Sequence, residues 1–315
     1  MRIGELDPGP RDSIADVGVR VGHTTLIEGE DVRTGVTVVL PPRLPLFAGA
    51  HRLNGNGELT GLEWIRESGL LTTPIGLTNT HSVGVVRDAL VAAQVEAGQE
   101  QWHLPVVGET WDGRLNDING FHVRAEHVHA ALAAASEDFA LGNVGGGTGM
   151  ICHGFKGGIG SASRRGGDHT VGVLVQANHG RRSRLRIDGV PVGRDFDDVP
   201  VPGGSIIVIV ATDAPLLPHQ CERVAQRAAL GIARTGGAGE NSSGDLLLCF
   251  STQEVGETVR MLPNEQIDAV FYAAIEATEA AIVSALIAAE TMTGRGTTVY
   301  AIDREAVAAI LERYA

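Results

Sequence analysis

The chain has 315 residues, 43% of them hydrophobic, so it is long enough to bury a sizeable core in one large domain or two small ones. Its formal net charge of −13 gives nucleic acid or an anionic membrane surface little electrostatic attraction. Glycine is in excess, with 42 residues against a usual share of about 7%, yet glycine and proline together stay below the roughly 25% that is typical of disordered chains.

Short apolar runs bounded by glycine or polar turns predict strands, and several are apolar almost throughout, which is typical of sheets covered on both faces. In chain order the predicted strands are 35–40, 75–78, 83–86, 171–176, 205–211, 246–251 and 297–302. Helical patterns lie between them, at 87–97, 125–135, 215–234, 264–290 and 304–313. No low-complexity linker, charge block or internal repeat divides the chain, so we expect one α/β domain.

Common signatures for nucleotides, hydrolase elbows and metals are not met. The glycine run 145–149 does not complete G-x-G-x-x-G, Lys156 is not followed by Ser or Thr, and no serine lies in G-x-S-x-G. The densest histidine cluster has the wrong spacing for a helical ligand pair, so we expect no metal site there: His122, His127 and His129, with Glu126.

Three cysteines provide neither an even disulfide framework nor a C-x-x-C motif. We expect buried thiols, with no disulfide and no thiol zinc site, at Cys152, Cys221 and Cys249. The N-terminal residues lack the apolar segment of a secretory signal, and we find no long uncharged apolar window. From these features we expect a cytoplasmic protein without a membrane span.

A glycine-rich stretch, 236–245 (G-G-A-G-E-N-S-S-G-D), runs directly into the predicted strand 246–251. A linker would have the same composition. A hydroxyl at the start of a strand can also attack the preceding carbonyl, convert the amide into an ester and, after hydrolysis, leave a serine that is an N-terminus. The α-amine of that serine, with an ordinary pKa of about 7.7–8.0, would then act as general base.

The helical pattern 264–290 carries one carboxylate, Glu279, on its apolar stripe. The stripe consists of Ile267, Phe271, Ile275, Ile282 and Leu286. A carboxylate is rarely buried without a partner. Either the helix bends and exposes Glu279, or a site supplies donors, such as an amine and a hydroxyl at a reaction centre.

Two further polar positions admit both a structural and a functional interpretation. The stretch 105–120 is dense in carboxylates and amides. It is either a network of turns or a site where Glu109, or an Asp beside it, receives a substrate ammonium. Asn178 follows the predicted strand 171–176, where its amide is either part of a turn or an oxyanion donor.

Long motifs along almost the whole chain match one known family. They are 16–23 (D-V-G-V-R-V-G-H), 53–61 (L-N-G-N-G-E-L-T-G), 77–86 (L-T-N-T-H-S-V-G-V-V), 108–120, 145–160, 171–178, 243–251 and 289–295 (A-E-T-M-T-G-R). On these residues the chain resembles the DmpA/BapA family, the L-aminopeptidase/D-esterase and β-aminopeptidase group of self-processing N-terminal-nucleophile peptidases.

The resemblance implies a four-layer α/β/β/α sandwich, no cofactor, a homo-oligomer, and a precursor cut into segments 1–242 and 243–315. Ser243 then resembles the family's nucleophile, and Asn178 its oxyanion amide. Glu279 resembles the carboxylate that works with the nucleophile. Glu109 resembles the acid that holds the amino group of the substrate.

Two positions depart from the family pattern. Ser242 stands where Gly or Asn is expected before the nucleophile, so cleavage before Ser242 and cleavage before Ser243 both stay open. Ala277 stands where some members carry a serine, so the relay hydroxyl is either missing or supplied by Thr278.

We therefore predict a serine aminopeptidase that hydrolyses amide or ester bonds after an unblocked N-terminal amino acid, with small peptides, amino-acid amides or esters as substrates. Two alternatives remain open. One is a related amide-bond enzyme, such as an acyltransferase or an oligoamide hydrolase. The other is a non-catalytic amine-binding protein on the same fold.

Overall fold

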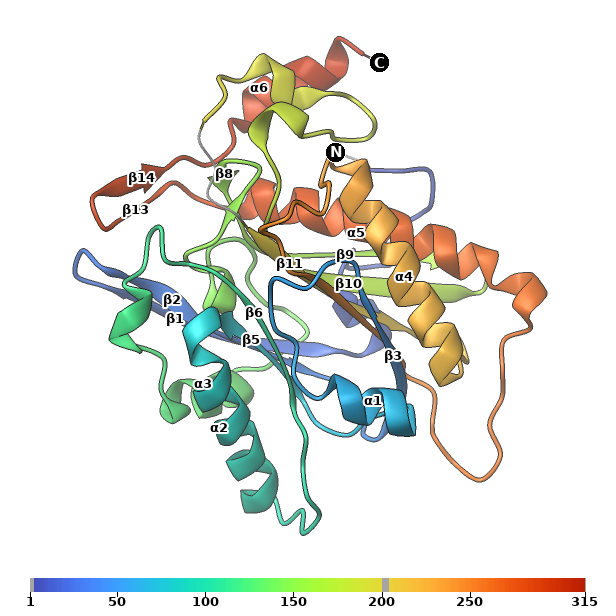
Figure 1. Ribbon diagram of the computed structural model, residues 1–315. Coiled ribbons are helices and arrows are strands. Elements are labelled where there is room, and N and C mark those ends of the chain that lie inside the picture. Colours follow the sequence, from blue (N-terminus) through green and yellow to red (C-terminus); the bar gives the residue numbers. More distant parts are fainter. Residues whose placement is uncertain (1–2, 200–203, 315) are drawn as a thin grey trace.

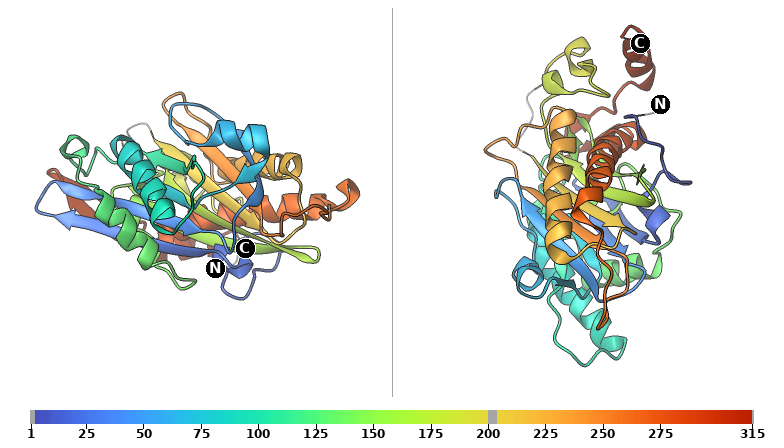
Figure 2. Two further views of the ribbon diagram at one scale, coloured as in Figure 1. Left: turned by 90° about the horizontal axis from the view of Figure 1, so that it is seen from below. Right: turned by 90° about the vertical axis from the view of Figure 1, so that its right-hand side faces the viewer.

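The computed structural model describes residues 3–199 and 204–314. Two sheets lie face to face, and each is covered on its outer face by a pair of helices (Figure 1). Figure 2 shows the molecule from two other sides. The arrangement is the four-layer α/β/β/α sandwich that the resemblance implies.

The smaller sheet has four strands in the order β1-β2-β5-β6. Their bounds are β1 Arg20–Glu28, β2 Val32–Leu40, β5 Ile75–Asn79 and β6 Val106–Thr110. β5 and β6 are parallel, and the other neighbours are antiparallel. Helices α2 (Val83–Glu96) and α3 (Ala125–Ala133) cover the outer face.

The larger sheet has six strands in the order β4-β3-β12-β11-β10-β9. Their bounds are β3 Leu46–Arg52, β4 Leu70–Leu71, β9 Gly158–Gly166, β10 His169–Asn178, β11 Ser205–Thr212 and β12 Asp245–Ser251. Helices α4 (Pro218–Arg234) and α5 (Asp268–Ala288) cover its outer face and run side by side, as the right-hand view of Figure 2 shows.

The larger sheet is buried on both faces, which explains its nearly continuous apolar strands. On β12, Leu246 and Leu248 point into the core between the two sheets, whereas Leu247 points toward α4 and α5. β11 alternates in the same way, with Ile207 facing inward and Val208 facing the helices. This period of two, with both faces apolar, is the pattern of a strand in the middle of a layered sandwich.

Shorter elements complete the chain. They are α1 Leu62–Ser68, α6 Arg304–Glu312, β7 Ile151–Cys152, β8 Phe155–Lys156, β13 Met292–Gly294 and β14 Thr297–Val299. Single 3-10 turns are η1 Ile14–Val17, η2 Thr80–Ser82, η3 Ile118–Gly120, η4 Gly145–Gly147, η5 Arg182–Arg184, η6 Val192–Asp195 and η7 Asn264–Gln266.

One predicted strand, 83–86, is wrong. These residues form the first turn of α2, because the Asn79 side chain accepts a hydrogen bond from Ser82 N and η2 leads straight into the helix. Among the described residues, eight strands were not predicted: β1, β3, β4, β6, β7, β8, β9 and β13. The helix expected from residue 215 begins at Pro218, with proline in its first turn, and ends before Gly236, whose φ of +92° stops it.

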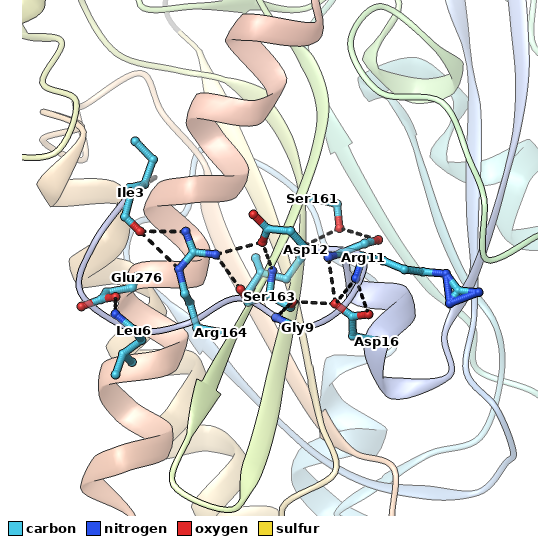
Figure 3. Close-up of polar contacts among 12 residues, drawn as sticks. Ile3, Leu6, Gly9, Arg11, Asp12, Asp16, Ser161, Ser163, Arg164 and Glu276 are labelled. Carbon is cyan, nitrogen blue, oxygen red and sulfur yellow. Dashed lines mark hydrogen bonds and ion pairs between the residues drawn. The ribbon is translucent and has the colours of Figure 1, made fainter. Parts of the chain in front are cut away.

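The segment before β1 is held against β9 and α5 by polar contacts (Figure 3). The guanidinium of Arg164 donates to the carbonyl of Ile3 and to Asp12. Glu276 lies on α5, and its carboxylate accepts a hydrogen bond from Leu6 N. Asp16 accepts from the hydroxyl of Ser163 at 2.7 Å. These contacts fix the N-terminal segment on the side of α5 away from α4.

Among the described residues, α5 is the one helix that is long and apolar enough to cross a membrane by length and composition. Its 18-residue window is 72% buried inside the protein, as expected for the central helix of a core. Gly160 lets this helix approach β9 closely, since a Cβ there would lie 2.0 Å from the carbonyl oxygen of Ala281. The helix therefore serves as packing for the larger sheet.

Candidate active site

Two of the candidate site residues, Asn178 and Ser243, lie at the same edge of the larger sheet. β11 and β12 are parallel, so their first residues lie together, and the antiparallel neighbours β10 and β3 end at the same edge. Asn178, the last residue of β10, pairs with Ser205, the first residue of β11. β6 of the smaller sheet passes over β11, because a Cβ on Gly108 would lie 3.0 Å from Ile207.

Ser243 lies two residues before the body of β12 and is 2% exposed. Its Oγ donates to Oδ1 of Asp245 at 2.5 Å. Burial raises the pKa of the Asp245 carboxyl to about 6, although the hydrogen bond from Ser243 acts in the opposite direction. A carboxylate with a pKa in this range can accept a hydroxyl proton near neutral pH.

The peptide bond before Ser243 is also held by hydrogen bonds. Nδ2 of Asn56 donates to the carbonyl oxygen of Ser242 at 2.8 Å. On the C-terminal side of Ser243, the backbone N of Gly244 donates to Oγ of Ser205 at 3.0 Å. The carbonyl of Ser242 is thus polarised by an amide donor on the same bond that Ser243 Oγ would attack.

Glu109 on β6 is buried, with 3% of its surface exposed. Oε1 accepts from Glu58 N at 2.9 Å, and Oε2 accepts from the hydroxyl of Thr80. Burial raises the pKa of the Glu109 carboxyl, and the two donors counteract that rise. Gly57 lies between Glu109 and the residue after Ser243, since a Cβ on Gly57 would stand 3.1 Å from both Oε1 of Glu109 and the Cα of Gly244.

A cavity of about 690 Å³ opens beside these groups. Its lining residues are Asn56, Gly57, Glu58, Thr80, Glu109, Trp111, Ser205 and Ser242. It therefore joins the carboxylate of Glu109 to Ser242 and to Asn56, which donates to the Ser242 carbonyl. A cavity of this size, with a few convergent polar groups, is typical of small-molecule sites.

Asn178 is buried behind the wall of this cavity. Its Oδ1 accepts from Ile151 N at 2.7 Å, which fixes the orientation of the amide, and its Nδ2 donates to the carbonyl of Trp111 at 3.0 Å. The second N–H of the amide makes no hydrogen bond to any residue that the structure describes. That N–H is the group that an oxyanion role requires.

The hydrogen-bond partners of Glu279 belong to another part of the molecule. It is fully buried on α5, where Oε2 accepts from the guanidinium of Arg234 and Oε1 accepts from Asp188 N at 3.1 Å. Burial raises the pKa of the Glu279 carboxyl, and Arg234 lowers it. The helix therefore does not expose Glu279, and in the described chain no hydrogen bond joins it to Ser243.

Three residues of the site were missed by the sequence analysis: Asn56, Ser205 and Asp245. The signal for Asp245 was present, because side chains two apart in an extended segment share a face, which applies to Ser243 and Asp245. Asn56 offered no such signal. It reaches the 242–243 bond only because β3 is the neighbour of β12, and β3 was not predicted.

A serine at the mouth of a central strand, a polarised preceding carbonyl and an acidic cavity define a hydrolase site. Peptidase family S58 matches residues 12–299, and the chain belongs to this family. The membership confirms the resemblance stated above and the prediction of a peptide-bond hydrolase of the aminopeptidase type.

Relatives and solved structures agree with this assignment. The β-peptidyl aminopeptidase BapA of Sphingosinicella microcystinivorans is 47% identical, with 98% of this chain and 89% of the relative covered. A Burkholderia sp. β-aminopeptidase is 54% identical and superposes with a TM-score of 0.94 over 99% of this chain and 97% of that one.

A third match supports the fold class. The L-aminopeptidase D-Ala-esterase/amidase of Ochrobactrum anthropi, described as a variant of the Ntn hydrolase fold, is 43% identical with a TM-score of 0.93. The alignment covers 99% of this chain and 96% of that structure. The predicted N-terminal-nucleophile-like sandwich is therefore confirmed.

Proposed function

We propose that the chain cuts its own 242–243 peptide bond and that the released Ser243 is the nucleophile of an aminopeptidase. The observation that carries this proposal is that the attacking hydroxyl and the carbonyl that it would attack already make hydrogen bonds. Oγ of Ser243 donates to Asp245 at 2.5 Å, and the carbonyl oxygen of Ser242 accepts from Asn56 at 2.8 Å.

Self-cleavage begins when Oγ of Ser243 gives its proton to the Asp245 carboxylate and attacks the carbonyl carbon of Ser242. Asn56 Nδ2 stabilises the developing oxyanion. The bond from that carbon to the Ser243 nitrogen breaks, the nitrogen takes a proton, and an ester joins Ser242 to Oγ. Water then hydrolyses the ester, leaving a carboxylate on Ser242 and a free amine and hydroxyl on Ser243.

These contacts favour cleavage before Ser243 over cleavage before Ser242. The carbonyl that accepts from Asn56 belongs to Ser242, and the hydroxyl that donates to a carboxylate belongs to Ser243. Ser242 lines the cavity instead. The two segments of the mature protein would be 1–242 and 243–315.

In turnover, the α-amine of Ser243 takes the proton from its own Oγ as Oγ attacks the scissile carbonyl of the substrate. An acyl-enzyme forms, the leaving amine or alcohol departs with a proton, and water releases the N-terminal amino acid. We assign Asn178 as an oxyanion donor through its second N–H. We propose that Glu279 supports the Ser243 amine in the mature protein.

Glu109 would bind the free amino group of the substrate. Its carboxylate is buried, lines the cavity and receives two hydrogen bonds that hold it in place. A buried carboxylate strongly favours a cationic partner. The substrate class that fits is therefore a short peptide, amide or ester whose first amino acid is unblocked, as the names of the β-peptidyl and L-amino-acid relatives also suggest.

We further propose a homo-oligomer in the cytoplasm. The family resemblance supports the assembly, and several large apolar side chains are exposed on the single chain, including Trp102, Phe121, Leu230, Tyr272 and Tyr300. Light scattering of the purified protein measures the assembly directly, and a monomer at working concentration would contradict it.

The aminopeptidase proposal is tested with paired chromogenic substrates. An amino-acid p-nitroanilide with a free amine should be hydrolysed, and its N-acetylated form should not. Ser243→Ala should hydrolyse neither. Equal rates on the free and acetylated substrates would contradict the role of the free amine.

A further inference from the structure

A cluster of metal-ligand side chains lies behind Asn178, outside the residues used so far. Cys152 ends β7, His153 follows it, and His179 follows the last residue of β10. Among the described residues these three form a group whose ligand atoms all lie within 4.8 Å of one another. All three side chains are buried.

Two ring nitrogens of this cluster lack a partner. Nε2 of His153 and Nε2 of His179 make no hydrogen bond to any described residue. A buried polar atom left without a partner costs roughly 1–3 kcal/mol. One ion takes only one nitrogen from each ring, and His179 presents Nδ1 to the Cys152 thiol. The unpartnered Nε2 of His153 is therefore the buried atom that an ion at this cluster would satisfy.

The tautomer of His153 is the one that metal binding requires. Its Nδ1 lies 3.1 Å from the carbonyl oxygen of Arg181, which can only accept. Nδ1 therefore carries the hydrogen, and Nε2 presents a lone pair to the cluster. A ligating histidine whose other nitrogen donates to a backbone carbonyl is the usual outer arrangement of a metal site.

We propose that Cys152, His153 and His179 bind a zinc ion. This reverses the expectation from cysteine spacing, because the fold brings His179, 27 residues away in sequence, next to Cys152. Sulfur and imidazole nitrogen are the ligands that Zn²⁺ prefers, at about 2.3 Å and 2.0–2.1 Å. Sγ of Cys152 and Nδ1 of His179 are already 3.9 Å apart, and the two histidine rings meet edge to face with centroids 5.1 Å apart. The ligand atoms need to approach by roughly 1 Å to close around an ion.

Charge balance at this site involves Glu240. Binding converts the thiol into a thiolate and releases one proton, so the ion with its three ligands carries one positive charge. Glu240 lies close enough to His153 to interact with it electrostatically, and its Oε1 is buried without a hydrogen-bond partner in the described chain. Its carboxylate would supply the opposite charge and is a candidate for a fourth ligand.

The ion would hold the catalytic edge in place. His179 follows Asn178, Cys152 follows Ile151, and Asn178 and Ile151 are joined by the 2.7 Å hydrogen bond that orients the Asn178 amide. Glu240 belongs to the loop before the 242–243 bond, and its carbonyl accepts from Ser243 N at 2.8 Å. A structural zinc ion at this position ties the oxyanion donor to the self-cleaving loop.

Metal content tests the proposal first. Protein expressed in zinc-supplemented medium, freed of its affinity tag and desalted, is analysed by inductively coupled plasma mass spectrometry. We expect about one zinc per chain in the wild type and in Cys249→Ser, which alters another buried cysteine. We expect less than a fifth of that in Cys152→Ser and in His179→Gln.

A second measurement covers the case in which those variants fail to fold. Wild-type protein refolded with Co²⁺ instead of Zn²⁺ should show a thiolate-to-cobalt charge-transfer band in the near ultraviolet, and Zn²⁺ should remove it. Both measurements are repeated on Ser243→Ala, so metal binding is scored whether or not the chain cuts itself. Metal-free wild type together with no cobalt–thiolate band would overturn the proposal.

Discussion

Oγ of Ser243 donates a hydrogen bond to Oδ1 of Asp245, 2.5 Å away on the same face of an extended segment. Asp245 is 1% exposed, and Nδ2 of Asn54 donates to its other carboxylate oxygen, Oδ2, at 3.3 Å, which holds the carboxylate in this orientation. In the uncut chain Ser243 has no free α-amine, and its hydroxyl therefore already has a proton acceptor in Asp245. In the proposed mechanism, self-cleavage and turnover therefore use different bases on the Ser243 hydroxyl.

Asp245→Asn should slow self-cleavage by about 10²–10⁴, the usual contribution of a general base. The amide keeps the shape of the side chain but cannot accept the proton. The rate is followed as conversion of the full-length band after refolding. Asp16→Asn is the matched control, because Asp16 also accepts from a serine hydroxyl, at 2.7 Å, in the N-terminal segment. Equal rates in both variants would rule out the assignment.

The pH dependence of self-cleavage follows from the raised pKa of Asp245, about 6. The reaction needs the ionised form, so the rate should increase roughly tenfold per pH unit below pH 6 and level off above about pH 7. Burial is the cause of the shift, so salt should move the midpoint little. A midpoint near the ordinary aspartate value would show that another group accepts the proton.

Asn56→Ala should slow self-cleavage by about 10²–10³, because it removes the donor to the Ser242 carbonyl. Asn143→Ala is the control: its Nδ2 also donates to a backbone carbonyl, that of Glu290, at 2.9 Å, far from the site. The control should process like the wild type. Rapid cleavage of the Asn56 variant would mean that the carbonyl is polarised by another group.

Glu109→Gln should lower kcat/KM on free-amine substrates by about 10–100-fold, the loss expected when a charged hydrogen-bond partner is made neutral. Self-cleavage should proceed, because Glu109 has no contact with the 242–243 bond. Glu58→Gln changes an exposed carboxylate on the same cavity and should have a much smaller effect. Similar losses in both variants would indicate general electrostatic attraction instead of one binding carboxylate.

Glu279→Gln should reduce turnover more than self-cleavage. In the uncut chain Glu279 is engaged by Arg234 and Asp188 N, and Asp245 is the carboxylate on the nucleophile. Glu276→Gln, one turn earlier on α5, is the control for helix stability, because Glu276 is buried and binds only the N-terminal segment in its hydrogen bonds to Glu5 N and Leu6 N. Thermal unfolding of both variants separates lost function from lost stability.

The apolar runs predicted β10, β11 and β12 of the larger sheet, because these central strands are buried on both faces and need no polar residues, but they missed β3, β4 and β9. β6 was interpreted as part of a loop, since its five residues include Glu109 and a glycine, and its burial comes from the sheets around it. The run 83–86 was too short to distinguish a strand from a helix by periodicity. Its helical state follows from the Asn79 cap.

The site was only partly predictable for a related reason. Glu109, Ser243 and Asn178 stood out by residue type and position, whereas Asn56 and Ser205 reach the backbone on either side of Ser243 only through the order of strands in the sheet. Part of the glycine excess serves close approach of the backbone at this site, because a Cβ on Gly244 would lie 2.5 Å from the carbonyl oxygen of Asn56. Gly146 instead packs between the sheets, against Gln176 and Leu77.

The most direct test of the account is the mass and N-terminal sequence of the purified protein. We expect two segments, the smaller of which begins Ser243-Gly244-Asp245, and a Ser243→Ala variant that stays whole near 33.0 kDa. A small segment that begins at Ser242 would contradict the register. A wild-type chain that remains whole under native conditions and yet releases N-terminal amino acids would contradict the mechanism.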